Sequence, residues 1–167
     1  MQDAASLSPD TDVRSIVLQE TLISTIPNAA VSAGFVWLLF GGRSHIGLWG
    51  MDGLAFDLVP TTFMLTLATT IALTLLFRKR LRDRTLTRPN AGGSPLPLPR
   101  NPMLRGIVLG FGLLLAFVPV SVIALSAIWQ ADWPFVQVLV FKIAYGVVVG
   151  WVATPLVVLA VMREQPA

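Results

Sequence analysis

The sequence predicts an all-α integral membrane protein, a bundle of four transmembrane helices with both termini in the cytoplasm. Three observations lead to this prediction. Hydrophobic residues make up 54% of the 167 residues and charged residues only 13%, whereas soluble domains carry about 25% charged residues. Four stretches are apolar over the roughly 20 residues that a helix needs to cross a bilayer. Basic residues are concentrated in one connection between these stretches.

The four predicted spans are bounded by proline and by polar capping residues. A signal peptide at the N-terminus is excluded because Asp3 and Asp10 stand where such a peptide carries positive charge. Asn101 precedes a proline at the third span, and such a pair suits the first turn of a helix. Pro60 is expected in the first turn of the second span. The predicted spans are residues 16–40, 57–78, 103–128 and 134–162.

The connections predict the orientation. Residues 79–102 form a basic, proline-rich linker. In contrast, Arg43 is the one arginine or lysine in the loop of residues 41–56, and the loop between the third and fourth spans has none. The positive-inside rule therefore places the linker on the cytoplasmic side of the membrane, which we expect to be a bacterial-type inner membrane. The loop 41–56 is apolar, so we expect it to lie along the outer interface or to fold over the end of the bundle. Tryptophans fall near the outer ends of the spans, at Trp37, Trp49, Trp129 and Trp133.

Basic residues at the start of the linker are candidates for binding anionic lipids. Each one near the membrane surface contributes about 1 kcal/mol to such binding. The alternative is a topology signal with no further role. The net charge of +3 comes from this linker, so we expect no nucleic-acid partner. The candidate lipid-binding residues are Arg78, Lys79, Arg80, Arg82 and Arg84.

Three charged residues lie within or beside the spans, where charge usually indicates function. At 1.5 Å per residue, Glu20 lies at the inner boundary, within reach of Arg78, Arg105 or Arg163. Asp57 and Lys142 lie at matching depths near the outer boundary, so a contact between them is predicted. The three charges form either a relay for protons or cations, or a set of boundary charges without such a role.

Two spans also carry rows of small polar residues. In the first, Glu20, Ser24, Asn28 and Ser32 recur every four residues around Pro27. Such a row either lines a substrate path or holds helices together at a kink. The second span has a row of threonines that we expect to face the first or fourth span. These are Thr62, Thr66, Thr69, Thr70 and Thr74.

Glycines spaced four apart occur in the last two spans, Gly106 with Gly110 and Gly146 with Gly150. Glycine lets two helix backbones approach closely, within this bundle or against a second protein. Prolines at comparable places in the two halves also indicate a weak parallel repeat, although helix punctuation alone produces the same pattern.

The chain offers little for chemistry. It has no cysteine and one histidine, His45, so we expect no catalytic residues, no metal site, no cofactor and no enzyme. The primary expectation is a structural or accessory protein that packs against itself or other subunits of a larger membrane complex. The alternative is a small oligomeric transporter or channel that uses the row on the first span and Lys142. A weaker possibility is a site for a pigment, quinone or lipid between the helices.

Overall fold

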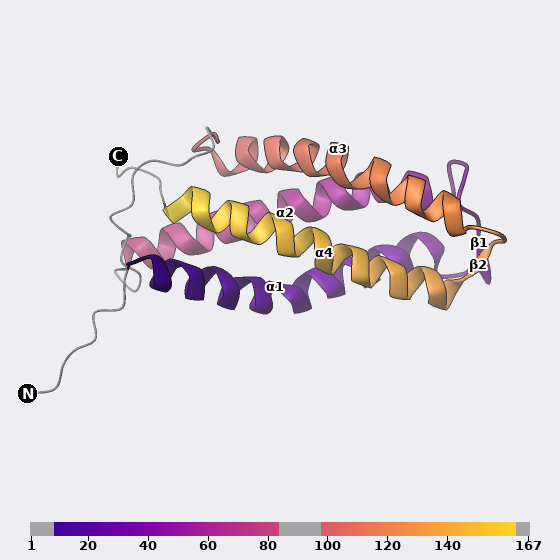
Figure 1. The fold of residues 1–167 in the computed structure, drawn as a ribbon, viewed down its shortest axis with the longest axis horizontal. Helices are drawn as coiled ribbons and strands as arrows, with labels where there is room; N and C mark the ends of the chain where they lie inside the picture. Colours follow the sequence, from indigo (N-terminus) through magenta and orange to yellow (C-terminus); the bar gives the residue numbers. More distant parts are fainter. Residues whose placement is uncertain (1–8, 84–97, 163–167) are drawn as a thin grey trace, which may run out of the picture.

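The computed structural model describes residues 9–83 and 98–162, with side chains from residue 14 onward. This part of the chain folds into four long helices and two short strands (Figure 1). Each of the four helices is long and apolar enough to cross a membrane, which confirms the predicted fold class to that extent. The elements in order are α1 (Pro9–Phe40), β1 (His45–Ile46), α2 (Leu54–Arg82), α3 (Pro102–Ile128), β2 (Trp133–Pro134) and α4 (Phe135–Met162).

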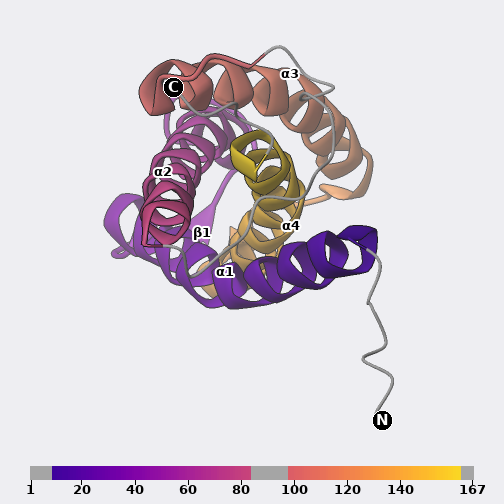
Figure 2. The same cartoon turned by 90° about the vertical axis from the view of Figure 1, so that its left-hand side faces the viewer.

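The helices do not pack mainly on their neighbours in sequence. Helix α1 packs along α4, α4 along α2, and α2 along α3, whereas α1 with α2 and α3 with α4 make few contacts. The end-on view shows α2 and α4 beside each other in the middle, with α3 above them and α1 below them (Figure 2). A site inside the bundle is therefore built from α1, α2 and α4, while α3 covers the far side of α2.

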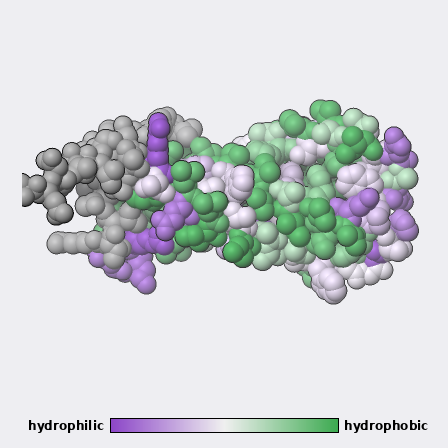
Figure 3. All heavy atoms as spheres, turned by 60° about the horizontal axis from the view of Figure 1, so that its bottom comes forward, coloured by the Kyte–Doolittle hydropathy of each residue, from purple (hydrophilic) through white to green (hydrophobic). Residues whose placement is uncertain are grey.

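The two ends of the bundle differ in chemistry. One end carries β1 and β2 and is called the strand end; at the other, called the basic end, α2 finishes with Lys79, Arg80 and Arg82. Helix α1 starts and α4 finishes at the basic end, so both described termini lie there (Figure 1). Hydrophobic side chains cover the middle of the molecule, and hydrophilic ones gather toward the two ends (Figure 3).

The strand end is closed by a short antiparallel pairing that the sequence analysis did not predict. His45 pairs with Pro134 and Ile46 with Trp133. Ile46 and Leu48 are buried, so the apolar loop folds over the end of the bundle, one of the two arrangements expected for it. The pairing ties the α1–α2 loop to the α3–α4 loop.

Two predicted helix starts are corrected by the structure. Helix α2 begins at Leu54, so Pro60 lies in its second turn and not in its first. Pro134 belongs to β2, and α4 begins one residue later at Phe135. In contrast, Asn101 caps α3 as the sequence suggests, because its side chain accepts a hydrogen bond from the backbone N–H of Met103 at 2.9 Å. The predicted linker 79–102 lies mostly outside the described residues.

Both pairs of glycines lie at contacts between helices of the bundle. An added Cβ at Gly146 would lie 1.8 Å from Ser32 Oγ, and one at Gly150 would lie 1.9 Å from Asn28 Nδ2. The α3 glycines meet α2 in the same way, with Gly106 facing Leu67 and Gly110 facing Phe63. The missing side chains therefore let α1 approach α4, and α3 approach α2.

The packing pattern also agrees with the weak repeat that the prolines suggested. In such a repeat, α1 corresponds to α3 and α2 corresponds to α4. The α1–α4 contact then corresponds to the α3–α2 contact, and the α2–α4 contact corresponds to itself. Likewise β1 corresponds to β2, and the two strands pair with each other. This arrangement is the one expected of two parallel hairpin repeats.

We predict that Gly146→Ala and Gly150→Ala each lower the free energy of unfolding by about 1–3 kcal/mol, because the new methyl group forces α1 away from α4. Thermal unfolding in detergent measures the effect. Gly34→Ala in α1 and Gly112→Ala in α3 are matched controls, because nothing lies within 4 Å of a Cβ at either position. Equal stability of the two pairs of variants would contradict this role.

Candidate functional site

Polar side chains of α1, α2 and α4 face one another in the interior. No member of this set is more than 9% exposed, although the outer surface of the same helices is apolar. A polar group buried among apolar side chains is costly unless it finds a hydrogen-bond partner. We call the set the polar line; it comprises Glu20, Ser24, Asn28, Ser32, Asp57, Thr61, Thr62, Thr66, Thr70, Thr74, Lys142, Tyr145 and Thr154.

At the strand end the polar line begins with a buried ion pair. Lys142 Nζ lies 2.5 Å from Asp57 Oδ2 and 2.6 Å from Thr61 Oγ1, and Thr61 Oγ1 donates to Asp57 Oδ1 at 3.2 Å. Lys142 is 0% exposed and Asp57 5%. The contact predicted between Asp57 and Lys142 is thus confirmed. Asp57 also stands in the first turn of α2, where the helix dipole favours a negative charge.

A second link between α2 and α4 follows directly. Thr62 Oγ1 lies 2.6 Å from the hydroxyl of Tyr145 and 2.6 Å from the carbonyl oxygen of Leu58. The ring of Tyr145 stacks on Phe141, with centroids 5.9 Å apart. Thr61 and Tyr145 were not among the site residues predicted from the sequence. The available signals were the four-residue spacing of Thr61 from Asp57 and the fact that Tyr145 is the one tyrosine of the chain.

In the middle of the bundle the row on α1 reaches both of its neighbours. Thr69 donates to Asn28 Oδ1 at 3.1 Å, which joins α2 to α1. Ser24 Oγ and Thr154 Oγ1 lie 3.0 Å apart, which joins α1 to α4. The predicted rows on the first and second spans therefore face each other and α4, as the sequence suggested for the threonines.

Several polar atoms along this line have spare hydrogen-bonding capacity. Within the described residues, the side-chain amide nitrogen of Asn28 and the hydroxyls of Ser32, Thr66, Thr70 and Thr74 have no hydrogen-bond partner. An unsatisfied buried group costs about 1–3 kcal/mol, and a water molecule can satisfy two or more such groups at once. From Asp57 to Thr74 the line runs about 26 Å at 1.5 Å per residue, close to the roughly 30 Å of a bilayer core.

At the basic end the polar line finishes in a second ion pair, between Glu20 and Arg80. The guanidinium group of Arg80 also lies 5.5 Å from the ring centre of Phe77. Arg80 is not one of the three arginines, Arg78, Arg105 and Arg163, that the sequence placed within reach of Glu20. Arg163 lies outside the described residues.

The other two arginines hold the end of the linker. Arg78 donates to the carbonyl oxygen of Arg100, and Arg105 Nε donates to that of Pro99 at 3.1 Å. Arg105, in the first turn of α3, is only 1% exposed, and its burial was not predicted from the sequence. Of the candidate lipid-binding residues, Arg78, Lys79, Arg80 and Arg82 lie at the end of α2, and Arg84 lies outside the described residues. Lipid binding stays a prediction.

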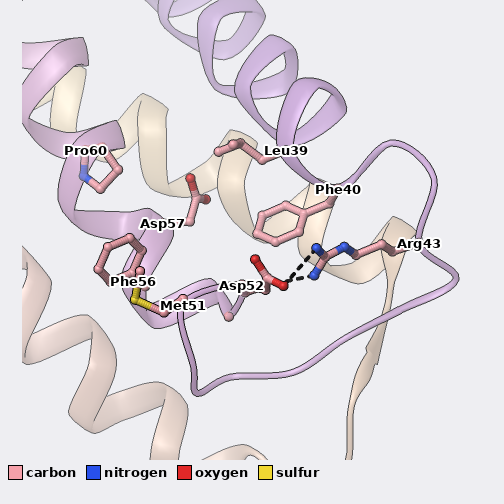
Figure 4. Close-up of a pocket in the computed structure, with 9 residues that line it drawn as sticks. Leu39, Phe40, Arg43, Met51, Asp52, Phe56, Asp57 and Pro60 are labelled. Carbon is pink, nitrogen blue, oxygen red and sulfur yellow. Dashed lines mark hydrogen bonds and ion pairs between the residues drawn. The ribbon is translucent and has the colours of Figure 1, made fainter.

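A pocket of about 130 Å³ lies at the strand end beside the Lys142 ion pair (Figure 4). Asp57 is the one member of the ion-pair cluster that lines it. Arg43 and Asp52 form an ion pair of 3.2 Å on the exposed side of the pocket. We call this the strand-end pocket; its lining residues are Leu39, Phe40, Arg43, Met51, Asp52, Gly53, Phe56, Asp57 and Pro60.

No metal-binding group of three or more histidine, aspartate or glutamate side chains occurs among the residues that the structure describes. His45 is exposed, and its Nδ1 lies 3.3 Å from the hydroxyl of Ser44. Comparisons with protein-family models, curated proteins and solved structures found no match to this chain. Function is therefore inferred from the geometry of the site.

We predict that Asp57→Asn lowers the free energy of unfolding by about 3–5 kcal/mol, because it leaves the buried ammonium group of Lys142 without its counter-ion. The double variant Asp57→Asn/Lys142→Met removes both charges and should recover most of that loss. Thermal or denaturant unfolding of the wild type, both single variants and the double variant measures the coupling. Additive effects of the two substitutions would show that the ion pair does not form.

Proposed function

We propose that the protein is an integral membrane protein with the strand end outside and the basic end in the cytoplasm, in a bacterial-type inner membrane. Three features support this proposal. Each helix is long and apolar enough to span a membrane. Basic residues are concentrated at the end where both described termini lie, as the positive-inside rule requires. Trp37, Trp49, Trp129 and Trp133 lie toward the opposite end, where an aromatic belt would meet the headgroups.

The absence of cysteine allows a direct test of this orientation. We predict that a cysteine at Ser44 in intact cells reacts with a membrane-impermeant maleimide, whereas a cysteine at Arg82 reacts only after the membrane is permeabilised. Both positions are exposed, so denatured samples provide the labelling maximum for each. The reverse pattern of labelling would overturn the proposed orientation.

We further propose that the protein is a small membrane transport protein that passes protons along the polar line. The observation that carries this proposal is the row of buried polar side chains between the Asp57–Lys142 pair at one end and the Glu20–Arg80 pair at the other. Hydroxyl groups both donate and accept hydrogen bonds, so a row of them with intervening water can pass a proton from one carboxylate region to the other. Buried ionisable groups in a membrane span are expected at such relays.

The packing indicates that the transported species is small. Gly146 and Gly150 bring α4 against Ser32 and Asn28, so passage of anything larger than a proton requires the helices to separate. The path lies among three helices of one chain, in contrast to the expectation that several copies are needed to enclose one. The proposal therefore assigns the path to the single chain, whatever its oligomeric state.

A structural or accessory role is the second candidate, and the exposed apolar surface favours it. Helix α3 packs mainly on α2 and exposes Phe111, Leu115 and Ile123, a face open to lipid or to another subunit. However, the glycine pairs, which the sequence offered as a partner-binding surface, are occupied within the bundle. Co-migration of this chain with a larger complex on a native gel of mild-detergent extracts would favour the accessory role.

We predict that purified protein in liposomes dissipates an imposed pH gradient faster than empty liposomes, with valinomycin and potassium clamping the membrane potential. The double variant Thr66→Val/Thr70→Val should slow this flux at least about tenfold, because it replaces two hydroxyls of the line with methyl groups of the same shape. Glu20→Gln should also slow it.

Thr21→Val is the matched control, since Thr21 lies outside the polar line and donates to the carbonyl oxygen of Val17 in its own helix. It should leave the flux unchanged. Wild-type flux equal to that of empty liposomes would overturn the proposal, and so would full flux through the double threonine variant.

A further inference from the structure

The strand-end pocket has walls and a base of different chemistry. Its walls are mostly carbon, from Leu39, Phe40, Met51 and Phe56. Asp57, which is 5% exposed, lies among these residues (Figure 4). Arg43 and Asp52 neutralise each other at the exposed side. The pocket therefore presents one buried negative group within an otherwise apolar lining.

The carboxylate of Asp57 is shared between the pocket and the interior of the bundle. Lys142 and Thr61 contact it but do not line the pocket, so Asp57 separates the two. An ionised carboxylate accepts about four hydrogen bonds, and these two side chains supply one each. Asp57 thus has capacity for a donor that enters from the pocket.

We propose that the strand-end pocket binds a small alkylammonium ion, whose apolar chain contacts the carbon walls and whose ammonium group donates to Asp57 in competition with Lys142. The interior face of the carboxylate already binds such a group, because a lysine side chain is an alkylammonium ion. Phe40 and Phe56 add aromatic faces that attract a cation. Thr61 Oγ1, 2.6 Å from Lys142 Nζ, remains as an acceptor when Asp57 turns to the ligand.

Other ligand classes fit the pocket less well. Ca²⁺ and Mg²⁺ need about six oxygen ligands, and Zn²⁺ needs about three or four protein ligands, whereas the apolar walls offer one buried carboxylate. An anion is repelled by Asp57, and a neutral apolar molecule leaves the carboxylate unused. The volume of about 130 Å³ is below the roughly 300–1,000 Å³ typical of sites for drug-sized molecules. The ligand is therefore a short amine.

This inference goes beyond the proposed proton transport, because it assigns a ligand to the strand-end pocket and does not require the ligand to cross the bundle. Binding of the amine is measured in micelles, without any proton flux, and proton flux is measured in liposomes, without any amine. The two proposals can therefore fail separately.

The test is a titration of n-butylammonium chloride into protein labelled with ¹³C at the methionine methyl groups, followed by NMR in micelles. Met51 lines the pocket, whereas Met64, Met103 and Met162 do not. We expect a saturable shift of the Met51 signal alone. Sodium chloride at equal ionic strength and n-butanol, which has the same chain without the charge, should not produce it.

Variants separate the role of Asp57 from a general effect on folding. Lys142→Met should tighten binding at least tenfold, because it removes the competing ammonium group. Asp57→Asn/Lys142→Met keeps the interior neutral and should abolish binding, with thermal unfolding confirming that it is folded. Asp83→Asn at the basic end is the matched control and should bind as the wild type does.

Three outcomes would overturn the proposal. These are a Met51 signal that does not saturate with n-butylammonium, an equal response to n-butanol, and unchanged binding by the folded double variant. Weaker binding by Lys142→Met would also contradict it, since the proposal requires the ligand and Lys142 to compete.

Discussion

A hydroxyl, amide or charge on an apolar helix must find its partner on a neighbouring helix, because hydrocarbon offers none. The arrangement of this bundle follows from that constraint. Helix α1 presents to its neighbours a single row with a four-residue period, from Glu20 through Ser24 and Asn28 to Ser32. Ser32 and Asn28 lie close to α4 because Gly146 and Gly150 have no side chains there, and Ser24 meets the hydroxyl of Thr154. Helix α2 completes the interior with its threonines.

The same constraint explains why the charges lie at the two ends of the polar line. An isolated charge inside an apolar bundle is far more costly than a hydroxyl group, so each charge comes with a partner. Lys142 and Asp57 pair at the strand end, and Glu20 and Arg80 pair at the basic end. Between them the line is made of neutral groups. A transport role uses these features together, whereas a purely structural role leaves the spare hydrogen-bonding groups unexplained.

Much of the fold could be predicted from the sequence, because span length and hydropathy alone determine that the helices are long and apolar. The Lys142–Asp57 contact was also predictable, since both charges lie at the same depth and each requires a partner. The packing order was not predictable, because α3 and α4 are apolar on nearly every face. Consequently the pairing of Glu20 with Arg80 was not foreseen, and the roles of Thr61, Tyr145 and Arg105 were missed. The short strand pairing was also missed, because two residues carry no periodic signal.

The central claim is that the interior of this bundle is polar although its surface is apolar, and the proposed proton path requires water to reach that interior. Water-edited solid-state NMR of the protein in lipid bilayers tests that claim most directly. It measures how fast magnetisation passes from water to each side chain. We expect rapid transfer to Thr66, Thr70 and Thr74, and slow transfer to exposed apolar residues such as Leu115 and Ile123. Transfer to the threonines as slow as to Leu115 would show a dry interior and contradict the account.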